Sequence, residues 1–173
     1  MHKKQNNIIC QDNFITKFLI KTRNKNNYEI IIDTEDCFYL KNCLLSISKE
    51  KNYIYPVFYF NKTRKRLHRI IMNCPKEMVV DHINGDTLDN RKCNLRVCTN
   101  AQNIMNSFPH KNKSCEFKGV CFSKKYKKWQ SQITFEKKNY FLGYFENKVD
   151  AAIVYNNAAI KYFGEFARLN EVN

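Results

Sequence analysis

Short hydrophobic runs separated by turn-forming residues predict a chain built mainly of short strands. Residues 28–32 and 53–60 each have the length and apolar content of a strand. Residues 66–72 are expected to pair with 53–60 as a hairpin, and residues 38–45 to form a short helix. Residues 1–27 are largely polar and rich in Asn and Lys, so we expect a loose end there with at most a short strand.

The last third of the chain predicts a small sheet covered on one face by a helix. Polar and apolar residues alternate over 130–135, which is typical of a half-buried strand, and 141–145 is the expected neighbouring strand. Apolar residues then recur at helical spacing over 149–163. Asn147 is a suitable N-cap and Gly164 a suitable stop. The helix would cover one face of the sheet and leave the other polar.

The middle of the chain predicts a strand, a loop, a second strand and a helix. Residues 78–81 are a short apolar run, residues 84–86 read Asn-Gly-Asp, which favours a turn, and residues 94–97 form a return strand. Thr99 and Gln102 have the spacing of a capping box that would open a helix. The overall pattern is that of an α+β protein.

This middle region carries the residues that point to chemistry. Asp81 and His82 are adjacent, Asn94 follows His82 by twelve residues, and Asn103 follows Asn94 by nine. A neutral His accepts a proton from water at cellular pH. A hard cation such as Mg²⁺ prefers carboxylate and amide oxygens. The set therefore suits phosphodiester hydrolysis with one metal ion, and Asp81 and Asn103 are expected to face an open, solvated site.

Residues 79–106, with Leu67-His68-Arg69 upstream, resemble the HNH endonuclease family, in the branch found among phage, organellar and viral homing endonucleases. The resemblance implies a small N-terminal β-sheet followed by a ββα-metal finger. It implies that His82 is the general base and that Asn94 holds the loop and the base in position. Asp81 and Asn103 would bind one Mg²⁺ or Mn²⁺.

The last third resembles the AP2 DNA-binding domain, a three-stranded antiparallel sheet packed on one helix. The motifs that carry the resemblance are Lys118-Gly119-Val120, Lys128-Trp129, Phe141-Leu142-Gly143-Tyr144-Phe145, Asp150-Ala151-Ala152, Tyr155-Asn156, Phe163-Gly164 and Arg168-Leu169-Asn170. The implied DNA contacts fall near Lys118, Cys121, Ser123, Gln132, Thr134, Asn139 and Phe141.

The sequence departs from the AP2 pattern where base specificity would be decided. Cys121, Ser123, Thr134 and Asn139 stand where the family usually has Arg. The family's base preference therefore cannot be transferred to this chain.

The charge of the chain favours a nucleic-acid partner. The formal net charge is +14, from 30 basic and 16 acidic residues. A protein this basic is attracted to polyphosphate. Basic residues crowd into 62–69 and 111–128. The expected DNA contacts in these two clusters are Arg64, Arg66, His68, Arg69, Lys125 and Lys128. Phosphate contacts of this kind position a protein without reading sequence.

The eight cysteines include no Cys-x-x-Cys pair, so no structural zinc is expected. The sequence shows no signal peptide and no apolar run of membrane length, which predicts a soluble intracellular protein with no membrane partner. The abundance of Asn, Lys, Ile, Tyr and Phe is typical of an AT-rich viral, phage or organellar genome.

These observations predict two modules. We expect a polar segment at 1–27, a nuclease domain at 28–106 with its catalytic finger at 78–106, a linker at 107–116, and an AP2-like domain at 117–173. The function they favour is a metal-dependent HNH endonuclease acting as a monomer on double-stranded DNA. The alternative is a non-catalytic DNA-binding regulator with a degenerate finger. RNA processing is a third possibility, for which the sequence offers no stacking platform or RNA module.

Overall fold

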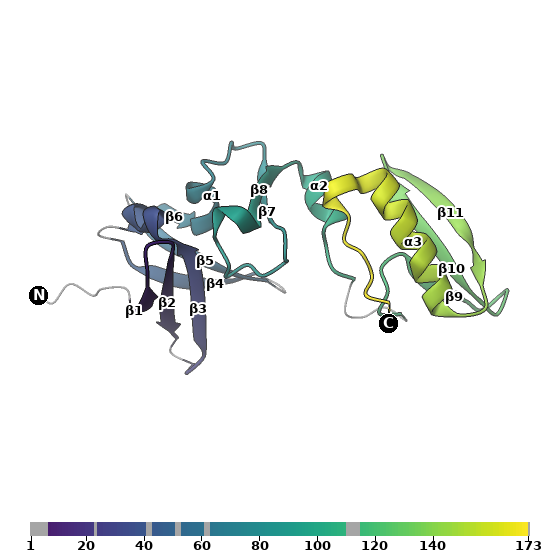
Figure 1. The fold of residues 1–173 in the computed structure, drawn as a ribbon, viewed down its shortest axis with the longest axis horizontal. Helices are drawn as coiled ribbons and strands as arrows, with labels where there is room; N and C mark the ends of the chain where they lie inside the picture. The colour runs from purple at the N-terminus through teal and green to yellow at the C-terminus, as the bar shows by residue number, and fades with distance from the viewer. Residues whose placement is uncertain are drawn as a thin grey trace, which may run out of the picture. The chain divides into compact units, whose positions relative to one another are not determined.

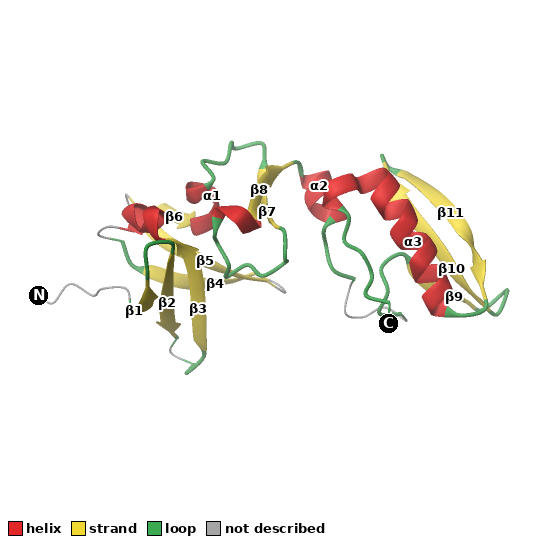
Figure 2. Cartoon of the chain, in the orientation of Figure 1, coloured by secondary structure: helices red, strands yellow, loops and turns green. Residues whose placement is uncertain are grey.

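A computed structural model describes residues 7–22, 24–40, 43–50, 53–60, 63–109 and 115–172. The predicted linker at 107–116 and the polar segment at 1–27 fall partly outside these ranges, and so does Lys62 of the first basic cluster. The chain divides into two compact units, Met1–Asn100 and Ala101–Asn173. Both are mixed α/β structures made of small antiparallel sheets and few helices (Figures 1 and 2).

The first unit contains two three-stranded antiparallel sheets and a two-stranded one. The first sheet has the order β1-β2-β3, the second β4-β5-β6, and the third pairs β7 with β8. The elements of this unit are β1 (Ile8–Gln11), β2 (Ile15–Lys21), β3 (Asn27–Asp33), the 3-10 helix η1 (Thr34–Leu40), β4 (Leu45–Glu50), β5 (Tyr53–Phe60), β6 (Thr63–Arg66), α1 (Leu67–Ile71), β7 (Val79–His82), the 3-10 helix η2 (Lys92–Asn94) and β8 (Leu95–Cys98).

One hydrophobic core joins these elements. It contains residues from both larger sheets, from α1 and from the β7–β8 pair. The buried members are Phe18, Ile30, Ile32, Leu40, Leu45, Phe58, Leu67, Ile71, Val80 and Leu95. Because Val80 and Leu95 belong to the same core as the N-terminal sheet, burial of that sheet supports the strands that carry Asp81 and His82.

Three sequence predictions in this unit were wrong. The segment 1–27 was expected to be a loose end with at most a short strand, but its described residues form β1 and β2 of the first sheet, because Phe18 of β2 is buried in the core. Residues 66–72 do not form the second strand of a hairpin. The strand that pairs with β5 is Thr63–Arg66, and a helix follows at Leu67–Ile71. Leu67 and Ile71 are four residues apart and both are buried, so a helical turn places both in the core. The short helix expected at 38–45 is instead the 3-10 helix at Thr34–Leu40.

The second unit is a three-stranded antiparallel sheet of order β11-β10-β9, with the helix α3 packed on one face (Figure 1). Asn147 accepts a hydrogen bond from the backbone N–H of Asp150 at 2.8 Å, which confirms the predicted N-cap. Gly164 ends the helix, also as predicted. The elements are α2 (Asn100–Met105), β9 (Val120–Ser123), β10 (Lys128–Phe135), β11 (Lys138–Phe145), α3 (Lys148–Phe163) and the 3-10 helix η3 (Gly164–Phe166).

Gly119 lets α3 approach the sheet closely. Its φ of 76° is a left-handed conformation, and a Cβ there would lie 2.0 Å from Cδ2 of Tyr155 and 2.7 Å from the Gln132 carbonyl oxygen. Tyr155 is only 2% exposed, so its ring has little room to move. Only glycine meets both demands at this position.

We predict that Gly119→Ala lowers the free energy of unfolding of the second unit by on the order of 3 kcal/mol, from backbone strain and steric overlap. Gly164→Ala is the matched control, because Gly164 also has positive φ, 53°, but nothing lies within 4 Å of its Cβ position. Urea unfolding followed by fluorescence of Trp129, the single Trp, measures both variants. Equal destabilisation would contradict the close-packing explanation.

Candidate active site

Asp81 and His82 are the last two residues of β7. The antiparallel register with β8 places Asp81 opposite Arg96 and His82 opposite Leu95. Asp81 and His82 are each 5% exposed. The expectation that Asp81 faces an open, solvated site is therefore wrong, because its carboxylate is held in the interior of the first unit.

Asp81 forms an ion pair with Arg96. Its Oδ2 accepts a hydrogen bond from Arg96 Nε at 2.9 Å, and Arg96 Nη2 lies 2.8 Å from the same oxygen in the ion pair. The side chains are 6% and 14% exposed, so the charges are shielded from water. Removing one partner from such a pair leaves an uncompensated buried charge and is strongly destabilising. Arg96 was not among the sequence-predicted site residues, although pairing of the two predicted strands would have placed it beside Asp81.

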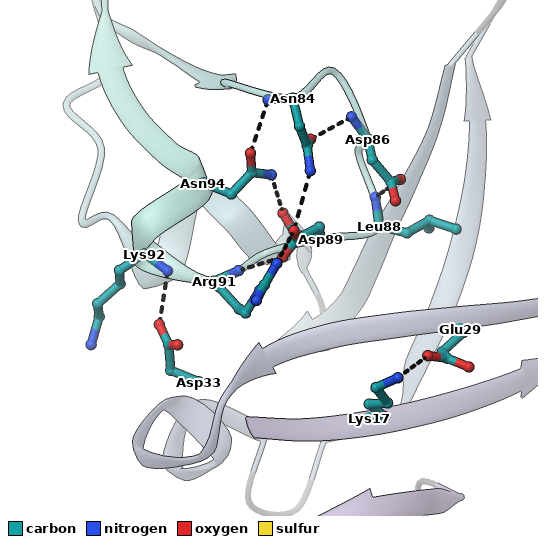
Figure 3. Close-up of polar contacts among 10 residues, drawn as sticks. All are labelled: Lys17, Glu29, Asp33, Asn84, Asp86, Leu88, Asp89, Arg91, Lys92 and Asn94. Atoms are coloured by element: carbon teal, nitrogen blue, oxygen red, sulfur yellow. Dashed lines mark hydrogen bonds and ion pairs between the residues drawn. The ribbon is translucent and has the colours of Figure 1, made fainter. Parts of the chain in front are cut away.

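The loop between β7 and β8 is closed by Asn94 (Figure 3). Its Oδ1 accepts from the backbone N–H of Asn84 at 2.9 Å, and its Nδ2 donates to the Asp89 carbonyl at 2.8 Å. Its own carbonyl accepts from the backbone N–H of Ile83 at 2.9 Å. Asn94 therefore fixes the chain directly after His82.

Asp89 provides a second fixed point in the same loop. Its carboxylate accepts from Arg91 at 2.8 and 2.7 Å and from Asn84 Nδ2 at 3.2 Å (Figure 3). These bonds hold the pKa of Asp89 below its ordinary value, with Arg91 the largest cause. Asn84 and Asp89 were missed as site residues because their residue types indicate turns in general.

The N-terminal sheet supports this loop through backbone contacts. Ile31 of β3 donates to the Leu88 carbonyl at 3.0 Å and accepts from the Asn90 N–H at 2.7 Å. The backbone N–H of Lys92 donates to Asp33 at 2.8 Å (Figure 3). The sheet before the finger thus has a direct structural role at the site.

The His82 ring is the first of three aromatic rings that contact one another in series. The His68 ring meets the His82 ring edge to face at a centroid distance of 5.1 Å, and Tyr55 meets His68 at 5.4 Å. Beyond them, the Arg66 guanidinium lies 4.9 Å from the Tyr55 ring centroid. His68 is 3% exposed, which does not fit its predicted contact with DNA, because a phosphate cannot reach a side chain so deeply buried.

Burial determines the protonation of both imidazoles. It lowers the pKa of His68 to about 3. Burial also lowers the pKa of His82, while a hydrogen bond with Asn90 and the nearby carboxylates oppose that shift. Both rings are therefore neutral at cellular pH, the state in which His82 can accept a proton. Asn90, which is fully buried, was also missed by the sequence interpretation.

Asn103 lies on α2 and is half-buried. The carbonyls at the end of this short helix are held within the second unit. Lys118 Nζ donates to the carbonyls of Met105 at 2.5 Å and Ser107 at 2.8 Å, and Arg168 Nε donates to that of Asn106 at 3.1 Å. Cationic donors stabilise the C-terminal end of a helix. Lys118, predicted to contact DNA, thus has a different observed partner.

The other basic residues predicted to contact DNA differ in their surroundings. Arg64 is exposed on β6, whereas Arg66 forms an ion pair with Glu50. Arg69 donates to the carbonyls of Met78 and Pro75, both at 2.8 Å, and so shapes the turn before β7. Lys128 pairs with Glu146 at 2.8 Å in an exposed position. DNA contact by these residues remains a prediction.

The predicted ligands of a metal ion are the carboxylate oxygens of Asp81 and the amide oxygen of Asn103. Within the described ranges, no three His, Cys, Asp or Glu side chains gather as a metal site. Asp81 already neutralises one cationic group, the Arg96 guanidinium, in a buried setting.

All eight cysteines are thiols. No helix in the described part of the chain has the length and apolar character needed to span a bilayer.

Comparison with known proteins places this region in a family. The family model described as HNH endonuclease matches residues 65–105, which include Asp81, His82, Asn94 and Asn103. An uncharacterized HNH endonuclease of Acanthamoeba polyphaga mimivirus is 34% identical over 137 residues, covering 73% of this chain and 70% of that protein. No solved structure matches the chain.

We predict that the buried His68 makes the first unit sensitive to acid. The unfolded chain protonates His68 below about pH 6.5, whereas the folded chain resists until about pH 3. Stability is therefore complete above pH 6.5 and falls as pH drops, by about 1.4 kcal/mol per pH unit for one such group. His68→Phe keeps a ring that cannot titrate, and should flatten the slope by that amount between pH 4.5 and 6. Urea unfolding followed by far-UV circular dichroism measures it, and an unchanged slope would contradict the prediction.

Proposed function

This chain belongs to the HNH endonuclease family, and from that membership we propose that it is a divalent-metal-dependent endonuclease that hydrolyses DNA phosphodiesters. The observation that carries the proposal is the position of His82 at the end of β7, buried, neutral and adjacent to the carboxylate of Asp81. A base with this protonation state and an oxygen ligand beside it suit attack by water on a phosphate.

His82 is the proposed general base. Its neutral ring takes a proton from water, the water oxygen bonds to phosphorus, and the bond from phosphorus to the leaving sugar oxygen breaks. The packing of the His68 ring against His82 holds the imidazole against rotation. Asn94 keeps the following loop in place, so the base is already oriented before substrate arrives.

Asp81 and Asn103 are the proposed ligands of a Mg²⁺ or Mn²⁺ ion. A carboxylate and an amide carbonyl are hard oxygen donors of the kind these ions prefer. When bound, such an ion neutralises the charge that builds on the phosphate and the leaving oxygen. The role of Arg96 is to hold the Asp81 carboxylate in one orientation.

We further propose that the second unit delivers the nuclease to DNA through the face of its sheet opposite α3, as an AP2-like domain. The lysine-rich turn beside this face supports the proposal, and Lys125 and Lys128 are the proposed phosphate contacts. The viral relative fits an origin in a viral mobile element of the homing-endonuclease type. One finger acts on one strand, so a monomer should nick double-stranded DNA.

The retained alternative is a DNA-binding regulator whose finger is inactive. The chain contains all four proposed site residues, Asp81, His82, Asn94 and Asn103. The first three are buried. No specific observation favours inactivity.

The first test is the His82→Ala variant with His82→Gln beside it, since the amide keeps more of the side-chain volume. Loss of a general base should reduce the rate of nicking by about 10²–10⁴-fold. DNA affinity should stay near that of the unsubstituted protein, because the base acts on water. The measurements are conversion of supercoiled plasmid with Mg²⁺ or Mn²⁺, and fluorescence anisotropy without metal. Nicking at an unchanged rate in both variants would refute the assignment of His82, and no metal-dependent nicking by the unsubstituted protein would favour the regulator.

The second test separates metal binding by Asp81 from its structural pairing. Asp81→Asn should weaken Mn²⁺ binding at least tenfold by calorimetry and also lower stability by about 3 kcal/mol, because Arg96 loses its buried partner. Adding Arg96→Met removes the unpaired charge, so it should restore most of the stability but not the Mn²⁺ affinity. Recovery of both properties in the double variant would show that Asp81 has only a structural role.

A further inference from the structure

The sheet face opposite α3 carries an ordered set of amides and rings without a charged group among them. Ser131 and Ile133 of β10 are buried toward α3, so their neighbours Gln130, Gln132 and Thr134 project to the opposite face. The register pairs Gln130 with Tyr144, Gln132 with Phe141 and Thr134 with Asn139, which places the three β11 residues on that face too. We call these six residues the amide face.

Hydrogen bonds fix the side chains of the amide face. Gln132 Oε1 accepts from Gln130 Nε2 at 3.0 Å and from Asn139 Nδ2 at 3.2 Å. Thr134 Oγ1 donates to Asn139 Oδ1 at 3.3 Å. The amides are therefore held in one arrangement across two strands, and a ligand that they recognise does not have to order them first.

Exposed rings lie beside this network. Phe141 is 57% exposed, and its ring lies 4.9 Å from that of Tyr144, which in turn lies 4.7 Å from that of Tyr126. The surface thus presents amide groups and large apolar groups side by side. Neither kind of group attracts phosphate by charge.

Positive charge gathers at both ends of β10 instead. Lys124, Lys125 and Lys127 lie on the turn that precedes this strand, and Lys137 and Lys138 lie at the turn that follows it, beside Glu136. A strand of eight residues spans roughly 26 Å, which exceeds the major-groove width of about 12 Å. The two groups of lysines can therefore reach phosphates on both sides of a groove while the middle of the strand lies in it. This charge pattern fits duplex DNA as the occupant.

We propose that the amide face reads A·T base pairs in the major groove. Gln and Asn pair with the N6 and N7 edge of adenine, and an apolar ring fits the methyl group of thymine. Guanine is read by Arg or Lys, and the six residues of the amide face include neither; the only Arg after residue 114 is Arg168. Its guanidinium is occupied elsewhere, by the Asn106 carbonyl and the Phe108 ring. This inference rests on the proposed DNA-targeting role of the second unit and specifies what that unit recognises.

The test uses the full chain, without divalent metal. Lys118 and Arg168 bind carbonyls at the end of α2, and a fragment that lacks α2 would leave these two donors without those partners. Fluorescence anisotropy compares three duplexes with identical flanks, whose cores are mixed A·T, mixed G·C, and A·T with 7-deazaadenine in place of adenine. We expect the A·T core to bind at least about tenfold more tightly than the G·C core. The 7-deazaadenine core should lose most of that advantage, because it lacks the N7 acceptor of the major groove.

Variants assign the preference to residues. Gln132→Ala and Asn139→Ala should remove the preference for A·T and leave affinity for the G·C core unchanged. Lys125→Ala should weaken binding to both cores by the same factor. Asn157→Ala is the matched control, since Asn157 is an exposed amide on α3, and it should change neither affinity.

The outcomes distinguish this inference from the proposed function. Equal, salt-sensitive affinity for A·T and G·C cores would overturn A·T reading and leave DNA targeting intact. An A·T preference that survives 7-deazaadenine in full would mean that the amides do not read the N6 and N7 edge of adenine, and would also overturn the inference. No affinity for any duplex would refute the targeting function itself. Dimerisation that Phe141→Ala abolishes would show that a second copy of the chain, and not DNA, occupies the face.

Discussion

The hydrogen bonds of Asn94 close the loop that follows His82, and the geometry of the site depends on this closure. The loop runs from Ile83 to Asn94 and contains many polar residues whose backbone groups need partners once buried. Asn94 satisfies three of these groups at once, on both arms of the loop. Without it, the chain directly after β7 would lose three hydrogen bonds that fix the backbone next to His82.

Asp81 and His82 are both buried at the end of β7, but they have different partners there. The carboxylate of Asp81 forms an ion pair with the Arg96 guanidinium in the interior, at hydrogen-bonding distance. Burial lowers the pKa of the His82 imidazole, although Asn90 and nearby carboxylates oppose this shift, so its uncharged form is favoured. One short strand thus presents a paired carboxylate and a neutral imidazole side by side.

The second unit combines a rigid scaffold with a specific surface. The side of the sheet that faces α3 contains Ile133, Tyr155, Ala159 and Phe163, while Gly119 permits close contact between helix and sheet. The opposite side is free of that packing demand, and its side chains bond to one another instead. Lys118 and Arg168 of the same unit hold the carbonyls at the end of α2, so the helix that carries Asn103 depends on residues far along the sequence.

The sequence by itself determined the elements whose signals are local. The strands on either side of the Asn-Gly-Asp turn, the Asn147 cap and the Gly164 stop all follow from neighbouring residues, and so does the adjacency of Asp81 and His82. Tertiary structure decided what depends on distant partners. Residues 67–71 became a helix because Leu67 and Ile71 share one core, and His68 became an interior contact of His82 rather than a surface group. The pairing of Asp81 with Arg96 and the support of the loop by Ile31 likewise need a strand register that no local pattern specifies. Hydrophobic side chains are buried, and buried charges are paired, only in the folded chain. Local sequence patterns therefore cannot predict these contacts.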